Sequence, residues 1–243
     1  MKGVILAGGK GTRLHPLTKT LNKHLLPVGR EPMIHNPIRN MVACGVREVL
    51  VVTSSSHMGD IVNLLGGGRE FGLDLTYKVQ DEALGIADAL RLAEGFAGAD
   101  NVLVLLGDNV FENPVDFFVR NYLDGQGGRG ARVMLCEVAE PSQFGVAALD
   151  EKKVVEIQEK PDRPKSPYAV VGAYLYDPRV WDVIRGLSKS ARGEYEITAV
   201  NNEYIRLGEL EYDFVRGRWM DTGTFESYAI ANAWMFERPF PGG

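Results

Sequence analysis

Apolar runs alternate with helix-like segments over the first half of the chain, and this alternation constrains the fold more than any other feature. Strands are predicted for residues 3–7, 46–54, 73–79 and 100–109, and helices for residues 31–45, 57–68 and 82–96. Runs that are apolar at almost every position are typical of strands buried on both faces. We therefore expect an α/β, Rossmann-like three-layer domain whose central sheet is mainly parallel but mixed.

The second half of the chain is less regular. Strands are predicted for residues 131–138, 154–160 and 169–177, and helices for 195–208 and 225–237. The glycine-rich segment 125–130 is expected to be a loop, and neither a long Pro, Gly or Ser linker nor an internal repeat divides the chain. A single domain over residues 1–243 is therefore predicted.

Composition excludes several classes of partner. The formal net charge of −5 gives no basic field for nucleic acid. No apolar stretch approaches the ~20 residues of a membrane span, and the N-terminus has no signal-peptide pattern. The two cysteines, Cys44 and Cys136, are expected to be buried thiols in a reducing compartment. We therefore expect a cytoplasmic protein that binds neither nucleic acid nor membrane.

A glycine loop with nearby cations follows the first predicted strand. Gly8, Gly9 and Gly11 allow backbone N–H groups to approach an anion closely, and Arg13 and Lys23 add positive charge. The spacing matches neither a Walker A loop nor the G-x-G-x-x-G dinucleotide motif. A plain turn with a solvated lysine is the alternative, but the loop indicates a site for a phosphorylated ligand.

Several motifs in one order resemble a known family. The stretch LAGGKGTRLHPLTKTLNKHLLPV, followed by LGDNVF, FGVAALD, EKPDRPKSPYAVVGAYLYD, RGEYEIT and WMDTGT, is similar to the signature of sugar nucleotidyltransferases. Among these, the chain most resembles glucose-1-phosphate thymidylyltransferases, although it is shorter than their commonest form.

The resemblance implies the reaction and its components. The enzyme would transfer a thymidylyl group from dTTP to glucose 1-phosphate with Mg²⁺, giving dTDP-glucose and pyrophosphate. A homodimer or homotetramer would be expected. Two alternatives remain open: a uridylyltransferase that uses UTP, and a non-catalytic homologue that binds nucleotide sugars and regulates a partner.

The resemblance also implies a nucleotide-binding first half, about residues 1–112. The residues expected there are Leu6, Gly8, Gly9, Gly11, Thr12, Arg13, Lys23, Gln80, Gly85 and Asp108. Backbone N–H groups of residues 8–12 would hold the triphosphate, Arg13 the departing pyrophosphate, and Lys23 the α-phosphate or the sugar phosphate. Arg13, Lys23 and Lys160 would be catalytic.

A sugar-binding half is implied for about residues 113–243. Its expected residues are Phe144, Gly145, Glu159, Lys160, Val170 and Arg192. Glu159 would accept hydrogen bonds from sugar hydroxyls and Lys160 would pair with the sugar phosphate. A surface ion pair at 159–160 and a helix-start charge pair at Arg192 are the alternatives.

Asp108 and Asp221 are the expected metal ligands. The resemblance would place them together, and two carboxylates with phosphate oxygens form a normal Mg²⁺ shell. Alternatively, Asp108 is a turn or cap residue and Asp221 caps the last helix.

Gln80 is the expected base-recognition residue. Its amide offers a donor and an acceptor, which matches the N3–H and carbonyl of thymine or uracil, and Gly85 would leave room for the base. An exposed loop glutamine is the alternative.

Two positions depart from the family pattern: His24 stands where many thymidylyltransferases have Gln, and Phe144 where they commonly have Tyr.

Overall fold

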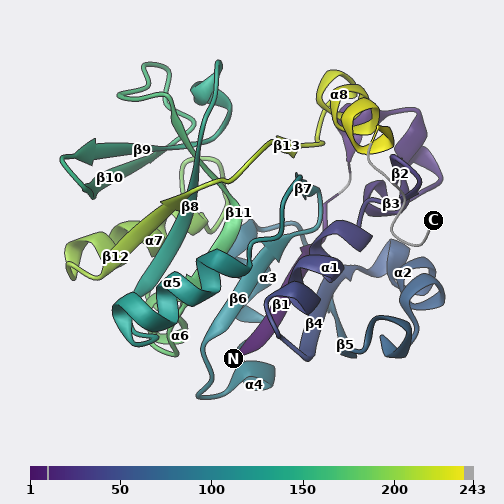
Figure 1. Ribbon diagram of the computed structural model, residues 1–243, viewed down its shortest axis with the longest axis horizontal. Coiled ribbons are helices and arrows are strands. Elements are labelled where there is room, and N and C mark those ends of the chain that lie inside the picture. The colour runs from purple at the N-terminus through teal and green to yellow at the C-terminus, as the bar shows by residue number, and fades with distance from the viewer. Residues whose placement is uncertain (10, 238–243) are drawn as a thin grey trace.

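A mixed sheet of nine strands forms the centre of the computed structural model, which describes residues 1–9 and 11–237 (Figure 1). Seven strands follow the order β10-β9-β11-β6-β1-β4-β5, and β8 and β12 extend the sheet from β11. The nine strands are β1 (Lys2–Ala7), β4 (Glu48–Ser54), β5 (Asp74–Gln80), β6 (Val102–Leu106), β8 (Ala131–Glu137), β9 (Gly145–Asp150), β10 (Lys153–Glu159), β11 (Tyr168–Tyr176) and β12 (Leu210–Phe214).

Strand direction divides this sheet into two regions. β6, β1, β4 and β5 are parallel to one another, whereas β11 runs antiparallel to β6, β8 and β9. Because parallel strands end at one edge, the segments after β1, β5 and β6 meet there. The glycine loop and Asp108 lie in the segments after β1 and β6, and Gln80 is the last residue of β5. The predicted α/β fold with a mixed, largely parallel sheet is confirmed.

Helices cover both faces of the sheet. α1 (His35–Ala43), α2 (Met58–Leu65) and α5 (Asp116–Gln126) pack on one face; α3 (Ile86–Arg91), α4 (Glu94–Ala97), α6 (Val180–Arg185) and α7 (Ile197–Arg206) pack on the other. β1 shows why two cores form: Val4 and Leu6 join one, and Ile5 and Ala7 the other. Alternate side chains of a strand point to opposite faces, so a fully apolar strand fills both cores. None of the described helices is long and apolar enough to cross a membrane.

Two short ladders and the last helix complete the fold beside the carboxyl edge of the sheet. β2 (Pro27–Val28) pairs with β3 (Glu31–Pro32), and β7 (Asn109–Phe111) pairs with β13 (Trp219–Asp221). α8 (Phe225–Phe236) packs on β2 and on a third small core. That core contains Leu14, Leu26, Val28, Met33, Val110, Ala231 and Trp234. The C-terminal helix thus lies against the segment that follows the glycine loop (Figure 1).

Some predicted elements differ from the observed ones. The helix predicted over 31–45 begins only at His35, because Glu31 and Pro32 belong to the β2–β3 hairpin. The helix predicted over 82–96 is split into α3 and α4, and it begins at Ile86 because Gly85 has φ 103°. Sequence analysis did not assign α5, α6, β9 or β12, which are short or lack a clean period.

Candidate active site

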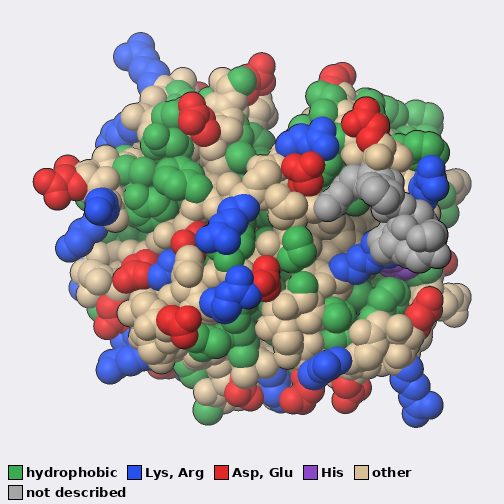
Figure 2. Space-filling model, in the orientation of Figure 1, with side chains coloured by type: hydrophobic (Ala, Val, Ile, Leu, Met, Phe, Trp, Pro, Cys, Tyr) green, Lys and Arg blue, Asp and Glu red, His purple; other side chains and the backbone are tan. Residues whose placement is uncertain are grey.

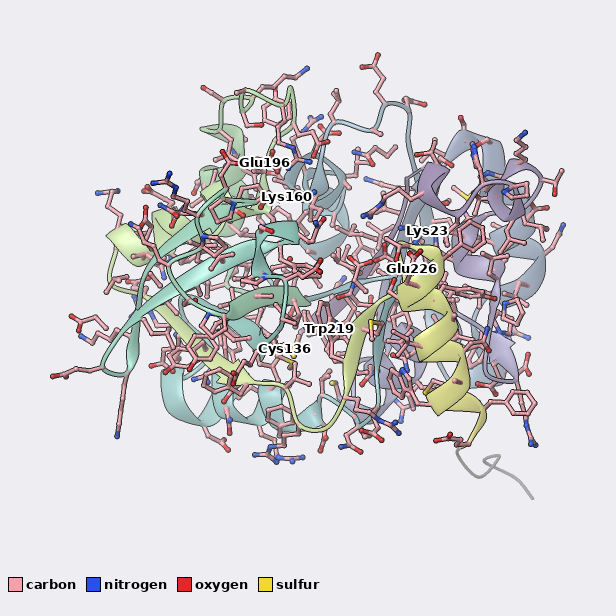
Figure 3. The ribbon with its side chains drawn as sticks, turned by 90° about the horizontal axis from the view of Figure 1, so that it is seen from above. Lys23, Cys136, Lys160, Glu196, Trp219 and Glu226 are labelled. Atoms are coloured by element: carbon pink, nitrogen blue, oxygen red, sulfur yellow. The ribbon has the colours of Figure 1, made fainter. Side chains whose placement is uncertain are left out.

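A cleft of about 800 Å³ opens between the β9–β10 region and α8. In Figure 2 this region is the notch at the top of the molecule. Figure 3 shows Lys160, Glu196 and Cys136 on one side, Lys23 and Glu226 on the other, and Trp219 between the two sides. The cleft is lined by predicted sugar-site residues and also by Arg13 and Asp221. Residues far apart in the sequence therefore share one cavity wall.

The two predicted metal ligands are brought together by the β7–β13 ladder. In this ladder Asp221 lies opposite Asn109, the residue after Asp108. The Thr222 hydroxyl donates to the carbonyl oxygen of Asp108 at 2.7 Å, and the Thr222 N–H donates to the same oxygen at 3.0 Å. These bonds hold the two aspartate segments side by side. Asp221 does not cap the last helix, because the N-cap is Thr224, which forms a capping box with Ser227.

The two aspartates differ in how easily they ionise. Lys23 forms an ion pair with Asp108. Burial opposes ionisation of Asp108, but the charge of Lys23 and the hydrogen bonds from Lys23 and Asn109 hold its pKa well below the usual range. Burial and the charge of Asp108 raise the pKa of Asp221 to about 6. The two partly exposed carboxylates therefore share Lys23, and the Arg13 guanidinium lies on the solvent side of Asp221.

The donor set at this pair fits Mg²⁺. Among residues 1–9 and 11–237 no group of three or more His, Cys, Asp or Glu side chains could hold a metal. Mg²⁺ is commonly held by one or two carboxylates, with substrate phosphates and water completing its shell. Asp108 and Asp221 match that pattern.

The glycine loop turns back onto Lys23. Gly9 and Gly11 have φ of 97° and 59°, so both use backbone conformations that favour glycine. A Cβ on Gly11 would lie 3.2 Å from the Cβ of Lys23. A short 3-10 turn, Thr12–Leu14, follows the loop where a dinucleotide fold has a long helix. Lys10 belongs to residues 8–12, whose backbone N–H groups are predicted to hold the triphosphate, but it lies outside the described residues.

Arg13 and Leu6 take different places around this loop. The exposed Arg13 reaches the aspartate pair: a Cβ on Gly223 would lie 2.6 Å from Arg13 Nη2 and 2.7 Å from Asp221 Oδ1. Leu6 is buried in the sheet, where its carbonyl oxygen accepts a hydrogen bond from the N–H of Gly107 at 2.9 Å.

Asn109 is a central residue that sequence analysis missed. Its Oδ1 accepts from the N–H of Gly172 at 2.9 Å and from the Trp219 indole at 2.8 Å. Its Nδ2 donates to Asp108 Oδ1 at 3.0 Å. Gly172 is required here, because a Cβ would lie 2.6 Å from the Asn109 side chain. The LGDN motif contains the residue, but only the fold reveals its partners.

The predicted sugar residues Phe144, Gly145, Glu159, Lys160 and Val170 all line the cleft. Glu159 Oε2 accepts from the Thr198 hydroxyl at 2.6 Å, and a Cβ on Gly145 would lie 3.2 Å from Thr198 Oγ1 and 3.4 Å from Glu159 Oε2. Lys160 has φ 43°, a left-handed conformation, and its N–H donates to the carbonyl of Phe144 at 2.9 Å. Such backbone strain in a non-glycine residue is typical of functional sites. Phe144 packs edge-on against Trp219.

Arg192 is held outside this wall. Its guanidinium lies 3.2 Å from Glu159, 3.3 Å from Glu196 and 3.6 Å from Glu194. Arg192 is not among the described residues that line the cleft. Contact with a sugar phosphate would require it to leave these carboxylates.

Gln80 lines a second pocket of about 400 Å³ together with Gly9 and Thr12. Its Nε2 donates to Asp88 Oδ2 at 2.9 Å and lies 3.4 Å from the carbonyl oxygen of Gly85. Gly85 has a structural reason to be glycine, because a Cβ would lie 2.6 Å from the carbonyl oxygen of Tyr195. The fold thus joins the RGEYEIT segment to the start of α3.

His24 is buried beside the LGDN segment. Its N–H and Nδ1 lie 2.8 and 2.6 Å from Asn22 Oδ1, so the ring carries its proton on Nδ1. Burial lowers the pKa of His24 to about 3. A Cβ on Gly107 would lie 2.7 Å from its ring. His24 thus supports the Asp108 segment as a neutral residue.

Comparison with known proteins places this site in a family. The model of the family described as nucleotidyl transferase matches residues 2–237. This chain belongs to the nucleotidyl transferase family. It is 44% identical to a glucose-1-phosphate thymidylyltransferase of Mycolicibacterium smegmatis over 96% of this chain and 81% of the relative. Identity to the Neisseria meningitidis enzyme of the same name is 43%, over 93% and 80% of the two chains.

Solved structures agree with this assignment. A Bacillus anthracis protein, provisionally described as a glucose-1-phosphate thymidylyltransferase and crystallised with sucrose, has a TM-score of 0.94 and 48% identity over 99% of this chain and 97% of its own. A UDP-glucose pyrophosphorylase complexed with UDP-glucose has a TM-score of 0.85 and 24% identity over 98% and 99% of the chains, which shows the fold alone. The chain is a nucleotidyltransferase of the sugar 1-phosphate class, similar to glucose-1-phosphate thymidylyltransferases.

Proposed function

We propose that this protein transfers a thymidylyl group from dTTP to glucose 1-phosphate, releasing pyrophosphate. The observation that carries the proposal is the pairing of the Asp108 and Asp221 segments beside Lys23, where Asp221 and Arg13 line a cleft that also contains Lys160. The relatives that cover nearly the whole chain carry the thymidylyltransferase name, which favours dTTP.

The two reactants would enter from the two sides of the cleft. The triphosphate would lie on the glycine loop, Gly8–Thr12, with its base toward Gln80. The sugar would lie against Phe144, Gly145 and Val170, with its hydroxyls on Glu159 and its phosphate toward Lys160. In this proposal residues of about 1–112 hold the nucleotide and residues of about 113–243 the sugar, within one domain.

The chemical step needs no proton transfer. An ionised oxygen of the sugar phosphate attacks the α-phosphorus and forms a new P–O bond. The bond between the α-phosphorus and the bridging oxygen to the β-phosphate breaks, and pyrophosphate leaves with that electron pair. Both reactants are anions, and like charges ~4 Å apart repel by ~4 kcal/mol even at an effective dielectric constant near 20. Cations fixed in the cleft therefore favour the approach.

Each cation has a distinct position for this task. Arg13 lies next to Asp221 and can bind two oxygens of the departing pyrophosphate with its planar fork. Lys23, fixed by Asp108, faces the α-phosphate or the sugar phosphate. Lys160 serves the sugar phosphate from the opposite wall. We propose that Asp108 and Asp221 hold Mg²⁺, which when bound supplies charge neutralisation at the α-phosphate.

Pyrophosphate release tests the proposal. The purified protein is incubated with Mg²⁺ and each combination of dTTP, UTP or CTP with glucose 1-phosphate or another sugar 1-phosphate. The highest kcat/KM is expected for dTTP with glucose 1-phosphate. A higher value with UTP would instead identify a uridylyltransferase. Binding of dTDP-glucose without any pyrophosphate release would indicate a regulatory homologue.

A further inference from the structure

The amide of Gln80 has only one orientation that its surroundings permit. On one side lie the Asp88 carboxylate, 2.9 Å from Nε2, and the carbonyl oxygen of Gly85, 3.4 Å from Nε2. Both groups only accept hydrogen bonds. The amide nitrogen must therefore face them, and the amide oxygen must face away.

The oxygen faces the glycine loop. The position of a Cβ on Gly8 would lie 3.3 Å from Gln80 Oε1, and Gln80 lines the same pocket as Gly9 and Thr12. A ligand on this loop therefore meets an acceptor at Gln80, because the donor edge of the amide is already occupied.

Asp88 is itself fixed. Its side chain is only 7% exposed, and its Oδ1 accepts from Arg91 Nη2 at 2.8 Å. One carboxylate oxygen thus serves Arg91 and the other serves Gln80. A carboxylate cannot invert this pattern, since both of its oxygens accept.

We propose that Asp88 is a positioning residue for base selection: by fixing the Gln80 amide oxygen toward the nucleotide, it selects bases with a ring N–H. The proposal rests on the proposed function, in which Gln80 faces the base. Thymine and uracil carry N3–H as a donor, which the Gln80 oxygen can accept. Cytosine carries an unprotonated N3, so two acceptors would face each other.

Such a pair of facing acceptors is disfavoured, because sites built on hydrogen bonds reject mismatched analogues far better than apolar pockets do. The Gln80 side chain alone does not provide this selection. A glutamine that could turn its amide would offer either edge and would accept cytosine as well.

The substitution Asp88→Asn tests this assignment. Arg91 only donates, so it attracts the oxygen of the new amide and turns the amide nitrogen toward Gln80. Gln80 would then turn its oxygen to that nitrogen, give up its long 3.4 Å hydrogen bond to the Gly85 carbonyl, and present Nε2 to the base. The measurement is equilibrium binding of dTTP and dCTP by calorimetry, which needs no turnover. The wild-type protein is expected to prefer dTTP at least ~10-fold, and Asp88→Asn to lower this ratio at least ~10-fold, with a gain in dCTP affinity.

Arg91→Gln is the matched control. It removes the second partner of Asp88 but leaves both carboxylate oxygens, so the dTTP to dCTP ratio should stay at the wild-type value. If Asp88→Asn alone does not fold, the double variant Asp88→Asn, Arg91→Gln lacks the unpaired guanidinium, and its ratio should still fall below that of the wild type.

The outcomes separate this proposal from the enzymatic one. A wild-type ratio in the folded Asp88 variant, or equal wild-type affinity for dTTP and dCTP, would overturn the role of Asp88. A loss of affinity for both nucleotides without a change of ratio would also overturn it, because that is the effect of a structural role. A protein that releases no pyrophosphate but shows the changed ratio would refute only the catalytic proposal.

Discussion

Asn109 lies opposite Asp221 in the β7–β13 ladder, and its side chain donates to Asp108 at 3.0 Å. A single residue thus connects both carboxylates of the site to β11, through the N–H of Gly172, and to the indole of Trp219. The distance between the carboxylates is therefore set by backbone pairing and by one buried amide, rather than by flexible side chains.

Replacement of Asn109 should damage both stability and activity. Asn109→Ala leaves the N–H groups of Gly172 and Trp219 unpaired in the interior, at a cost of about 3 kcal/mol. It also frees Asp108, so turnover should fall. Urea unfolding and pyrophosphate release measure the two effects. Asn113→Ala, an exposed asparagine in the same segment that bonds only the Arg216 carbonyl at 3.1 Å among described partners, should change neither.

Asp221→Asn should separate metal binding from folding. The substitution keeps the size of the side chain but removes one of two neighbouring like charges, so the protein should be as stable as the wild type or more stable. Turnover should fall at least ~100-fold, and the Mg²⁺ concentration for half-activity should rise. The control Thr224→Ala should cost about 1 kcal/mol through the lost helix cap and leave Mg²⁺ dependence intact. Wild-type rates for Asp221→Asn would remove Asp221 from the metal site.

Loss of either loop cation should lower turnover by ~100-fold or more, equivalent to roughly 3 kcal/mol of transition-state stabilisation. Arg13→Ala should fold normally because Arg13 is exposed. Lys23→Ala should also be less stable, because it leaves the largely desolvated Asp108, whose side chain is 15% exposed, without its ion-pair partner. Single-turnover rates and thermal melts measure both. Near-normal rates would refute the catalytic roles of Arg13 and Lys23. The control is Lys152→Ala, which removes an exposed lysine in the β9–β10 turn.

His24 should make the free energy of unfolding depend on pH in the acidic range. Its pKa is about 3 in the folded protein and 6.5 when unperturbed, so the unfolded chain takes up the proton first. The contribution of neutral His24 to the free energy of unfolding is complete above about pH 6.5 and is lost as pH falls toward 3. The loss amounts to about 2 kcal/mol at pH 5. Denaturant unfolding of wild type and His24→Gln at pH 8 and pH 5 measures it. The variant should lose about 2 kcal/mol less on acidification, and an equal loss would contradict the prediction.

Assembly should involve the outer face of α8. Trp234 and Ala231 are buried in the third core, but Ile230 and Phe236 are 54% and 56% exposed. A helix that is apolar on nearly all sides usually has a second partner. We predict a homodimer or homotetramer by light scattering, and Ile230→Asp should lower the mass. Leu123→Asp, which alters a 46% exposed leucine on α5, should not. A monomeric wild type would contradict the prediction.

The sequence determined much of the fold because local patterns carry it. The apolar run of β1 alternates between two cores, so its composition already requires a sheet covered on both faces. The glycines and cations near residue 13 lie close along the chain, so a shared role could be predicted from their spacing. Elements without a clean period, such as α5 and β12, were missed for the same reason.

Only the tertiary structure decided how distant residues meet. Asp108 and Asp221 are far apart in sequence, and no periodicity reports that β7 and β13 pair. The orientation of the Gln80 amide depends on Asp88, whose carboxylate is turned inward by α3. Asp221 was a candidate for the N-cap of α8 from sequence alone, but the capping box identifies Thr224 as the N-cap. These features arise from hydrogen bonds between segments, whose partners a linear sequence does not specify.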